Sequence, residues 1–366
     1  MKVIFCIRDD FLTRVGGDTI QLLNTKECLE SMYGIRTLIE TEPYKLKESG
    51  TDIVHIFNAQ TLDLSLKFAL NAKNAGKKIV LSPIFWDLSH SLFVTHLAKV
   101  GILNIRKGYR LLKKPHDFAI YLLGFLSKKY YFGSKRYIND LTKLISLSDL
   151  ILPNSPEELK ILENTTKIRH LKYKIVVNDV NQKIFKPVAK INNNKTVLIA
   201  GRIEPVKNQL SVARALMNDR EIKIIMVGAI SNKRYFDAIL KIAKTRGNIE
   251  IIPENISQFD LYDIYKKSDI HVLPSFRDSP GRSTLEAISV GLKAVVSSSA
   301  FCPVDFYFRE LINKKVFICD PYSIYSIRSA ILKALATPSY GESIEFRFSC
   351  EKATEQTFNA YKEILT

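Results

Sequence analysis

One stretch, FRDSPGRSTLEAISVG (276–291), gathers side chains that could bind a polar ligand: Asp278 precedes Glu286 by eight positions, with proline, glycine, arginine and hydroxyl residues between. One interpretation is structural, because STLE has the form of a capping box in which Ser283 and Glu286 satisfy the first N–H groups of a helix. The other is functional. A strand then ends in a loop whose N–H groups and following helix dipole bind an anion, and Gly281 lets the ligand come close. Carboxylates beside a phosphate would repel it, so they would accept hydrogen bonds from sugar hydroxyls.

A second cluster follows the apolar run TVLIA (196–200), after which come Gly201, Arg202 and Lys207. Two cations just past the carboxyl end of a strand, opposite a helix N-terminus, can clamp a diphosphate. Each charge-assisted hydrogen bond there would contribute about 1.5–3 kcal/mol. Either cation alone is better explained as a solvated side chain, whereas the pair at strand ends of one domain favours binding.

A third feature is the glycine pair Gly16-Gly17, in FLTRVGGDTIQLL (11–23), between a first strand and a first helix. The G-x-G-x-x-G fingerprint of dinucleotide binding is absent. Such a pair could bring backbone N–H groups up to a phosphate or a sugar, although taken alone it favours an ordinary turn.

Short apolar runs that alternate with helical stretches must position these clusters. In the first half the runs lie at 2–7, 36–40, 52–57, 78–83, 150–154 and 174–178. In the second half they lie at 196–200, 222–228, 249–253, 270–275, 293–298 and 316–320. Such runs are typical of parallel strands buried on both faces, and two similar sets predict an α/β protein with two Rossmann-like domains rather than a closed barrel. Ligands bind beyond the carboxyl ends of such strands, so we expect a ligand in a cleft between the domains.

The length and composition limit the number of domains, the kinds of partner and the compartment that we expect. With 366 residues, the chain has room for two domains of common size. A net charge of +17 favours anionic partners, and nucleic acid, an acidic membrane and phosphorylated substrates all satisfy it. Five scattered cysteines without a C-x-x-C pair argue against a disulfide framework or a zinc site and suit a reducing compartment. The first residues do not form a signal peptide, and the longest apolar run (118–126) covers about half a membrane crossing. We therefore expect a cytoplasmic protein.

The positive charge is concentrated in residues 99–136, which contain ten lysines and arginines and one acidic residue, Asp117. Aromatic residues are interleaved with these cations. A basic and aromatic amphipathic stretch predicts contact with an anionic membrane surface, at about 1 kcal/mol per cation. A solvated, lysine-rich helical insertion is the alternative. Nucleic acid binding is not expected, because no reader motif accompanies the charge.

The order of these pieces resembles the retaining sugar-nucleotide glycosyltransferases of family 4, in the group 1 glycosyl transferases, which have the GT-B fold. The matching motifs are the early Gly-Gly loop, SDLILPNSPEEL (148–159), VVNDVNQKIFKP (176–187), GRIEPVKNQ (201–209), LPSFRDSPGRSTLEAISVGLKAVV (273–296), ELINKKVFICDP (310–321) and FSCEKATEQTFNAYKEIL (348–365). The resemblance covers nearly the whole chain. It implies an acceptor-binding domain (1–188), a nucleotide-sugar-binding domain (189–345) and a last helix (346–366) that packs back on the first domain.

The resemblance also implies roles for the candidate residues. Arg202 and Lys207 would hold the donor diphosphate and stabilise the charge that develops on the leaving nucleotide. Glu286 would accept from the ribose, while Asp278 and the backbone of residues 280–282 would hold hydroxyls of the donor sugar. Further donor-binding candidates are Gly16, Gly17, Gly201, Pro280, Gly281, Arg282, Ser283 and Thr284. No protein nucleophile is needed, and neither a metal nor a cofactor is expected, because a D-x-D triplet is absent and the two cations would replace the metal.

The chain departs from the family pattern at three places. Asp278 stands where glutamate is usual. Asn178-Asp179 replaces the usual Asn-Gly pair. A histidine that contacts the donor sugar in many relatives has no clear counterpart, although Asp87 and His90 are candidates for an acceptor or sugar contact.

These observations predict a transferase that moves a sugar from a UDP- or GDP-linked donor to a glycan, with a lipid-linked acceptor. It would act in cell-surface polysaccharide or glycolipid biosynthesis, as a peripheral protein at the inner face of the cell membrane. Two alternatives stay open. One is a nucleotide-sugar 2-epimerase of the same fold. The other is a non-catalytic protein on this scaffold that binds membrane or nucleic acid.

Overall fold

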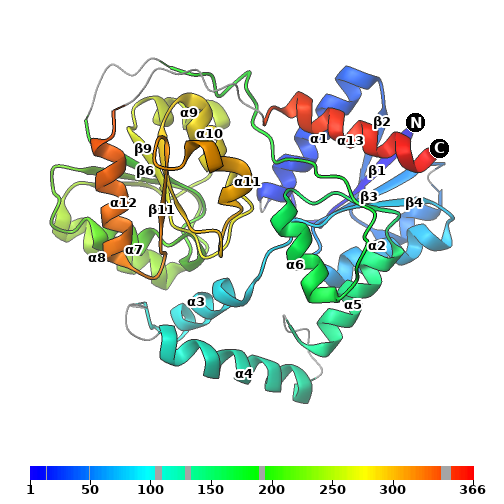
Figure 1. Ribbon diagram of the computed structural model, residues 1–366, viewed down its shortest axis with the longest axis horizontal. Coiled ribbons are helices and arrows are strands. Elements are labelled where there is room, and N and C mark those ends of the chain that lie inside the picture. Colours follow the sequence, from blue (N-terminus) through cyan, green and yellow to red (C-terminus); the bar gives the residue numbers. More distant parts are fainter. Residues whose placement is uncertain (14, 49, 104–108, 128–132, 189–193, 339–347) are drawn as a thin grey trace. The chain divides into compact units, whose positions relative to one another are not determined.

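The computed structural model describes the chain except for residues 14, 49, 104–108, 128–132, 189–193 and 339–347 (Figure 1). Its internal contacts divide the chain into two compact units. Unit 1 comprises Met1–Trp86, Ala119–Asp179 and Arg347–Thr366, and unit 2 comprises Asp87–Phe118 and Val180–Phe346. The domain boundaries predicted at 188/189 and 345/346 involve residues outside the described part, so they stay a prediction.

Unit 1 contains a parallel sheet whose described strands have the order β2-β1-β3-β4-β5. The strands are β1 (Lys2–Cys6), β2 (Arg36–Glu40), β3 (Ile53–Phe57), β4 (Lys78–Ser82) and β5 (Leu150–Ile151). All five residues of β3 are buried. A strand covered on both faces has no solvent side, which is why its sequence shows no polar alternation.

The sixth run predicted in this half, at 174–178, is not a strand. It follows β5 in an irregular path, in which the Lys174 N–H donates to the Ile151 carbonyl and the Val176 N–H to the Pro153 carbonyl, each at 3.0 Å. β5 itself spans only two residues. Pro153 has no N–H with which to extend the ladder, so the pairing stays short.

Helices surround this sheet. They are α1 (Gly17–Tyr33), η1 (Pro43–Glu48), α2 (Leu62–Asn74), α5 (Lys135–Leu147), α6 (Pro156–Thr166) and α13 (Cys350–Leu365). The last helix, α13, packs beside α1 in unit 1 (Figure 1). Its Phe358 ring stacks on Tyr33 at 4.0 Å, and the Tyr361 hydroxyl lies 2.6 Å from Nδ1 of the buried His55. The predicted return of the last helix to the first domain is therefore confirmed.

Unit 2 contains a second parallel sheet, with described strands in the order β11-β10-β9-β6-β7-β8. The strands are β6 (Thr196–Ala200), β7 (Lys223–Val227), β8 (Ile249–Ile252), β9 (Ile270–Leu273), β10 (Lys293–Ser297) and β11 (Val316–Cys319). All six runs predicted in the second half are strands. The helices are α3 (Ser89–Lys99), η2 (Pro205–Lys207), α7 (Gln209–Ala215), α8 (Lys233–Arg246), α9 (Gln258–Lys266), α10 (Arg282–Val290), α11 (Val304–Phe308), η3 (Arg309–Leu311) and α12 (Ile324–Ala336).

Helix α3 makes its contacts in unit 2, although the sequence analysis placed its residues in the first domain. Its Phe93 and Val94 form a buried apolar cluster with Phe276 and Phe301. The loop after β9 supplies Phe276, so α3 packs beside a predicted binding loop. Helix α4 (Tyr109–Ser127) follows and extends from residues of unit 2 into residues of unit 1.

Among the helices that the structure describes, none has the length and apolar character needed to cross a membrane.

Candidate functional site

The two main clusters predicted from the sequence lie where the strand order of the unit 2 sheet reverses. β6 and β9 are neighbours; from them the chain proceeds outward through β7 and β8 on one side and through β10 and β11 on the other. In open parallel sheets, ligands bind beyond the carboxyl ends of the strands at such a reversal. The segment from Gly201 to Lys207 follows β6, and the loop from Pro274 to Gly281 follows β9. Strand order therefore brings the two clusters together.

Two glycines shape the end of β6. Gly201 has a φ of +151° and Gly228, which follows β7, has a φ of +144°. A Cβ atom at Gly228 would lie 2.3 Å from the Gly201 carbonyl oxygen. The turns after the two strands therefore approach each other so closely that only glycine fits. Arg202 follows this contact, and its guanidinium forms an ion pair of 3.3 Å with Glu204 while its side chain stays 41% exposed.

Lys207 and Asp278 form an ion pair that joins the two clusters. The Lys207 Nζ donates to Asp278 Oδ2 at 2.9 Å, and the Ser275 hydroxyl donates to the same oxygen at 3.0 Å. The side chains are only 19% and 14% exposed. The Asp278 backbone N–H donates to the Phe301 carbonyl at 2.8 Å, which holds the loop in place. The result is a fixed, partly desolvated cation beside a carboxylate that accepts from two donors.

Asn208 fastens the two loops to each other, a role that sequence analysis missed. Its backbone is left-handed, with a φ of +62°, and its side chain is buried. Its Nδ2 donates to the Pro274 carbonyl at 3.1 Å and to the Pro321 carbonyl at 2.8 Å. Asparagine adopts this backbone conformation more readily than most residues, and here its amide also satisfies two loop carbonyls. Asn208 thereby positions the adjacent Lys207.

Helix α10 begins differently from the capping box that the sequence suggested. Gly281 is its N-cap, so Ser283 is the second residue of the helix and not its cap. Glu286 is buried, and its Oε2 accepts from the Tyr265 hydroxyl at 3.2 Å. The same hydroxyl lies 2.9 Å from the Ser283 carbonyl. Burial, followed by the charge of Glu286, raises the pKa of Tyr265 well above its ordinary value, so the phenol stays a donor. Tyr265, on α9, is a second residue that sequence analysis missed.

The remaining candidates of this loop lie close to Asp278. A Cβ atom at Gly281 would be 2.7 Å from the Leu273 side chain and 3.0 Å from Asp278 Oδ2, so the loop requires glycine there. Pro280 and Thr284 are buried, whereas Arg282 is partly exposed as the first residue of α10. The N-terminus of α10 thus lies close to the Lys207–Asp278 pair, and helix N-termini favour anions.

His90 lies in unit 2, next to this loop. Its Nδ1 is 2.9 Å from the Tyr322 hydroxyl, and its ring meets Phe301 edge-on at 5.0 Å. Burial, with the charge of Lys113, lowers the pKa of His90, so the neutral form is favoured. Asp87 has a local contact, in which its Oδ1 accepts from the Ser89 N–H at 2.7 Å at the start of α3.

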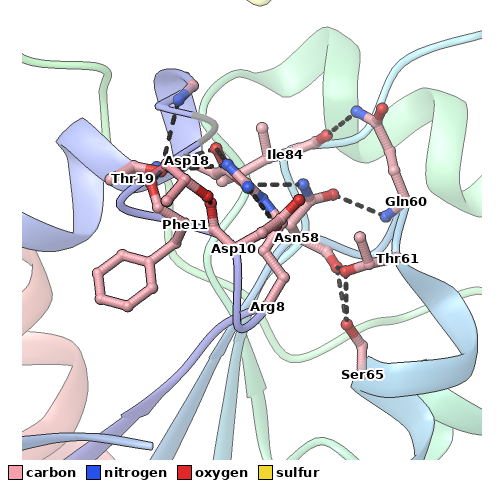
Figure 2. Close-up of polar contacts among 12 residues, drawn as sticks. Arg8, Asp10, Phe11, Asp18, Thr19, Asn58, Gln60, Thr61, Ser65 and Ile84 are labelled. Atoms are coloured by element: carbon pink, nitrogen blue, oxygen red, sulfur yellow. Dashed lines mark hydrogen bonds and ion pairs between the residues drawn. The ribbon is translucent and has the colours of Figure 1, made fainter. Parts of the chain in front are cut away.

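In unit 1, Gly16 and Gly17 lie at the start of α1, beside a polar cluster centred on Arg8 (Figure 2). Arg8 contacts both carboxylate oxygens of Asp18, at 3.2 and 3.3 Å, and Asp10 at 2.6 Å. A Cβ atom at Gly16 would be 2.6 Å from Asp18 Oδ1, which explains the glycine. Strand order reverses here too, between β1 and β3.

Asn58, after β3, completes this cluster by donating to Asp18 Oδ2 at 3.1 Å (Figure 2). Burial alone would raise the pKa of Asp18, but hydrogen bonds from Arg8 and Asn58 hold it below its ordinary value. Sequence analysis missed these residues, although the charged run after KVIFCI was a usable indication. The donor-binding role of Gly16 and Gly17 stays a prediction.

Comparisons with known proteins agree with this architecture. Residues 180–357 match the family described as Glycosyl transferases group 1. Over 110 residues the chain is 33% identical to O-antigen chain mannosyltransferase B from Escherichia coli. This match spans 28% of the chain and 27% of that relative, so only about a quarter of the relative's length is aligned.

Two solved structures resemble the entire chain. Sucrose-phosphate synthase from Thermosynechococcus elongatus has a TM-score of 0.72 at 13% identity, with 100% of this chain and 99% of that one covered. HepE from Anabaena, solved in complex with UDP and glucose, has a TM-score of 0.68 at 14% identity, with 99% of each chain covered. The chain has the GT-B fold, as the sequence resemblance implied.

Proposed function

We propose that this protein is a glycosyltransferase that moves a sugar from a nucleotide-sugar donor to a glycan acceptor. The observation that carries the proposal is the Lys207–Asp278 pair at the strand-order reversal of unit 2, next to the N-terminus of α10. This unit contains most of the segment that matches Glycosyl transferases group 1. HepE, the relative solved with UDP and glucose, supports a nucleotide-sugar donor, and the O-antigen relative supports a polysaccharide acceptor.

The donor diphosphate would bind to Arg202, Lys207 and the first N–H groups of α10. Lys207 already has a carboxylate partner, so the diphosphate would share its ammonium group with Asp278 rather than meet an unpaired charge. Asp278 could then accept from a hydroxyl of the donor sugar. As the sugar–phosphate bond breaks, negative charge grows on the leaving nucleotide, where fixed cations stabilise it most. Glu286, with one oxygen bonded to Tyr265, would accept from the ribose.

Retention of the anomeric configuration and independence from metal belong to the same proposal. The motif resemblance supports retention, because the glycosyltransferases that the sequence resembles are retaining. It supports independence from metal, because Arg202 and Lys207 would supply the positive charge that a metal supplies elsewhere. In the mechanism that the resemblance implies, the leaving phosphate helps to take the proton of the acceptor hydroxyl. We expect nucleotide release to persist in excess EDTA and the product to keep the configuration of the donor sugar, as read by the anomeric coupling in proton NMR.

The test is nucleotide release from a panel of UDP- and GDP-linked sugars, followed by substitution of Lys207. We expect Lys207→Ala to lower kcat/KM by about 100- to 1000-fold, the loss typical of removing one preorganised group that stabilises developing charge. Lys223→Ala is the matched control. Lys223 starts β7 at the amino edge of the same sheet, in an exposed ion pair with Glu250. The proposal is wrong if no donor releases nucleotide, or if the two variants behave alike.

We also propose that the acceptor is lipid-linked and that α4 brings the protein to an anionic membrane surface. Leu112, Phe118 and Leu122 of α4 are 42%, 67% and 43% exposed. Helical periodicity places them within roughly 120° of one another around the helix. Lys114 of the same helix is exposed and contributes positive charge, whereas Lys113 pairs with Asp117 at 2.5 Å and is only 11% exposed. An exposed apolar stripe beside a basic side chain is typical of a helix that lies in the membrane interface. The parts of residues 99–136 at 104–108 and 128–132 lie outside the described residues.

Vesicle co-sedimentation tests this attachment. We expect binding to phosphatidylglycerol vesicles, weakened by salt, and little binding to phosphatidylcholine vesicles. Phe118→Ser should reduce binding several-fold, because it removes apolar area that would enter the interface. Phe259→Ser is the control, since Phe259 on α9 is equally exposed, at 68%. Equal loss in both variants, or equal binding to both lipids, would contradict the assignment of α4.

A further inference from the structure

Gln209 in unit 2 is a buried polar side chain to which the proposed mechanism gives no role. It ends the motif GRIEPVKNQ (201–209) and is the first residue of α7. Its exposure is 0%, although glutamine is mostly found on protein surfaces. The contacts of its amide group therefore require an explanation.

The amide contacts both peptide groups that flank the Cα atom of Arg202. Its Nε2 donates to the Arg202 carbonyl at 2.7 Å and, more weakly, to the Gly201 carbonyl at 3.4 Å. The Gly201 carbonyl belongs to the peptide group before Arg202, and the Arg202 carbonyl to the peptide group after it. Because each peptide group is planar, holding both restricts φ and ψ of Arg202. The amide thereby sets the direction in which the Arg202 side chain leaves the backbone.

The two ends that Gln209 connects are themselves fixed. On the β6 side, the Ile203 N–H donates to the Ala229 carbonyl at 2.9 Å, which holds the second of these peptide groups from its other edge. On the α7 side, the Leu210 N–H donates to the hydroxyl of the buried Tyr235 at 2.9 Å. Gln209 therefore links a fixed helix start to the turn after β6.

The other atom of the same amide, Oε1, is buried and has no hydrogen-bond partner among the residues that the structure describes. Turning the amide over would place Oε1 against the Arg202 carbonyl, acceptor against acceptor, so only the observed orientation is favourable. A buried acceptor without a donor lowers stability, which an apolar side chain of the same length would avoid. The amide thus loses at Oε1 part of what it gains at Nε2, and its clearest effect is on the backbone of Arg202.

Arg202 depends on its backbone more than Lys207 does. Lys207 is held by the side chain of Asp278, whereas the Arg202 side chain is 41% exposed and pairs with Glu204 at 3.3 Å. A long, half-exposed arginine samples several rotamers. Its guanidinium reaches a defined place only if the backbone beneath it does not move.

We propose that Gln209 is a positioning residue of the diphosphate site, which acts on the ligand through the backbone of Arg202. This role rests on the proposed function, because it takes Arg202 as a contact of the donor diphosphate. A guanidinium that is prepared before the ligand arrives loses less conformational freedom on binding. Gln209 should therefore affect diphosphate binding only while Arg202 is present.

The experiment measures the binding of inorganic pyrophosphate to the full chain by isothermal titration calorimetry. Gln209→Met keeps the length and burial of the side chain but lacks the N–H donors. We expect Arg202→Ala to weaken binding by about 10- to 100-fold, the effect of one charge-assisted hydrogen bond. Gln209→Met alone should weaken it by about 3- to 10-fold, as a part of that effect. In the Arg202→Ala chain, adding Gln209→Met should change the affinity by less than about twofold, because residues that act through each other are not additive.

Gln258→Met is the matched control. Gln258 is the partly exposed first residue of α9 in the same unit, and this variant should bind pyrophosphate as the wild type does. The proposal is overturned if the wild type does not bind pyrophosphate, if Gln209→Met binds it unchanged or does not fold, or if Gln209→Met has the same effect without Arg202. If the wild type binds pyrophosphate as expected but releases nucleotide from no sugar donor, the transferase function is wrong while the role of Gln209 stands.

Gln209→Glu gives a second measurement. Glutamate has the shape of glutamine, but its carboxylate has no proton for the Arg202 carbonyl. Burial raises the pKa of such a carboxyl, as it raises the pKa of the buried Glu158 to about 7, and the protonated form can donate again. We expect its affinity for pyrophosphate, relative to the wild type at the same pH, to be about 10-fold lower at about pH 9 and to recover by about pH 6.

A relative affinity of Gln209→Glu that is the same at all pH values would contradict the role of the N–H donor. Direct repulsion between the carboxylate and pyrophosphate would give the same recovery in the absence of Arg202. A recovery that persists in the Arg202→Ala chain therefore also overturns the proposal.

Discussion

At the scale of single residues, the Lys207–Asp278 pair determines what the unit 2 site can bind. Asp278 stands where glutamate is usual in the glycosyltransferases that the sequence resembles, and its contacts in the structure fit the shorter side chain. Its Oδ2 already lies 2.9 Å from Lys207 Nζ and 3.0 Å from the Ser275 hydroxyl. The longer glutamate would have to displace one of these neighbours.

Removing the charge of Asp278 is a direct test at this scale. Asp278→Asn leaves Lys207 partly desolvated without its carboxylate, so we expect a loss of about 1–2 kcal/mol in the free energy of unfolding. If the carboxylate also holds a hydroxyl of the donor sugar, kcat/KM should fall by about 10- to 100-fold, since a hydrogen bond to a charged group contributes about 1.5–3 kcal/mol. Chemical denaturation and nucleotide release measure the two effects.

Asp237→Asn serves as the control for this prediction. Asp237 pairs with Lys233 at 3.1 Å on the exposed surface of α8, with 47% of its side chain accessible. Exposed ion pairs contribute about 0–1 kcal/mol, so this variant should leave both stability and turnover nearly unchanged. If Asp278→Asn and Asp237→Asn change stability and nucleotide release equally, Asp278 contributes no more than a carboxylate on the surface, and the prediction is wrong.

At the scale of elements, the turns after β6 and β7 must fit against each other before Arg202 and Lys207 can be placed. Gly228→Ala would put a Cβ atom 2.3 Å from the Gly201 carbonyl oxygen at a φ of +144°. We expect a loss of about 2–5 kcal/mol in the stability of unit 2, the sum of backbone strain of about 1–2 and overpacking of about 1–3 kcal/mol. Nucleotide release should fall as well, because the turn carries the cations.

Gly247→Ala separates backbone strain from steric clash. Gly247 is the left-handed C-cap of α8, with a φ of +77°, and a Cβ atom added there would meet nothing within 4 Å. This variant should cost only about 1 kcal/mol and leave nucleotide release intact. Thermal denaturation compares the stability of the Gly228→Ala and Gly247→Ala variants. Similar melting temperatures would show that a small backbone shift relieves the close approach at Gly228.

At the scale of the whole molecule, both units contain a fully buried histidine, which makes stability depend on pH. Burial lowers the pKa of His55 in unit 1 to about 3, and it does the same for His271 in unit 2. The unfolded chain takes up a proton at each histidine as the pH falls through about 6.5, whereas the folded units stay neutral down to about 3. Their stabilising contribution is therefore complete above pH 6.5 and is lost as the pH falls from there toward 3.

We expect unfolding midpoints to fall steadily between about pH 7 and pH 4, with a slope that reflects proton uptake by the unfolded chain. His55→Gln should flatten this slope for unit 1, even if the variant is less stable at neutral pH. His170→Gln replaces an exposed histidine and should leave the slope unchanged. An unaltered pH slope in the His55 variant would show that other groups cause the acid sensitivity.

Local patterns were sufficient for most of the fold. Eleven of the predicted apolar runs are strands, because a strand buried on both faces needs consecutive apolar residues wherever it lies. The run at 174–178 is also apolar, but its neighbour β5 spans only two residues and ends near Pro153. The run therefore has only a short strand edge with which to pair. The clusters after β6 and β9 were predictable for a related reason, since the carboxyl ends of neighbouring parallel strands meet at one edge.

By itself, the sequence determined the two parallel sheets, the loops that carry the chemistry and the return of the last helix, because burial and turn preferences act over a few neighbouring residues. Only the tertiary structure decided that Lys207 pairs with Asp278, that the Tyr265 hydroxyl contacts Glu286, and that α3 packs in unit 2. These contacts join residues that lie well apart in the chain. Their distances depend on how complete helices and strands pack, which no short stretch of sequence specifies.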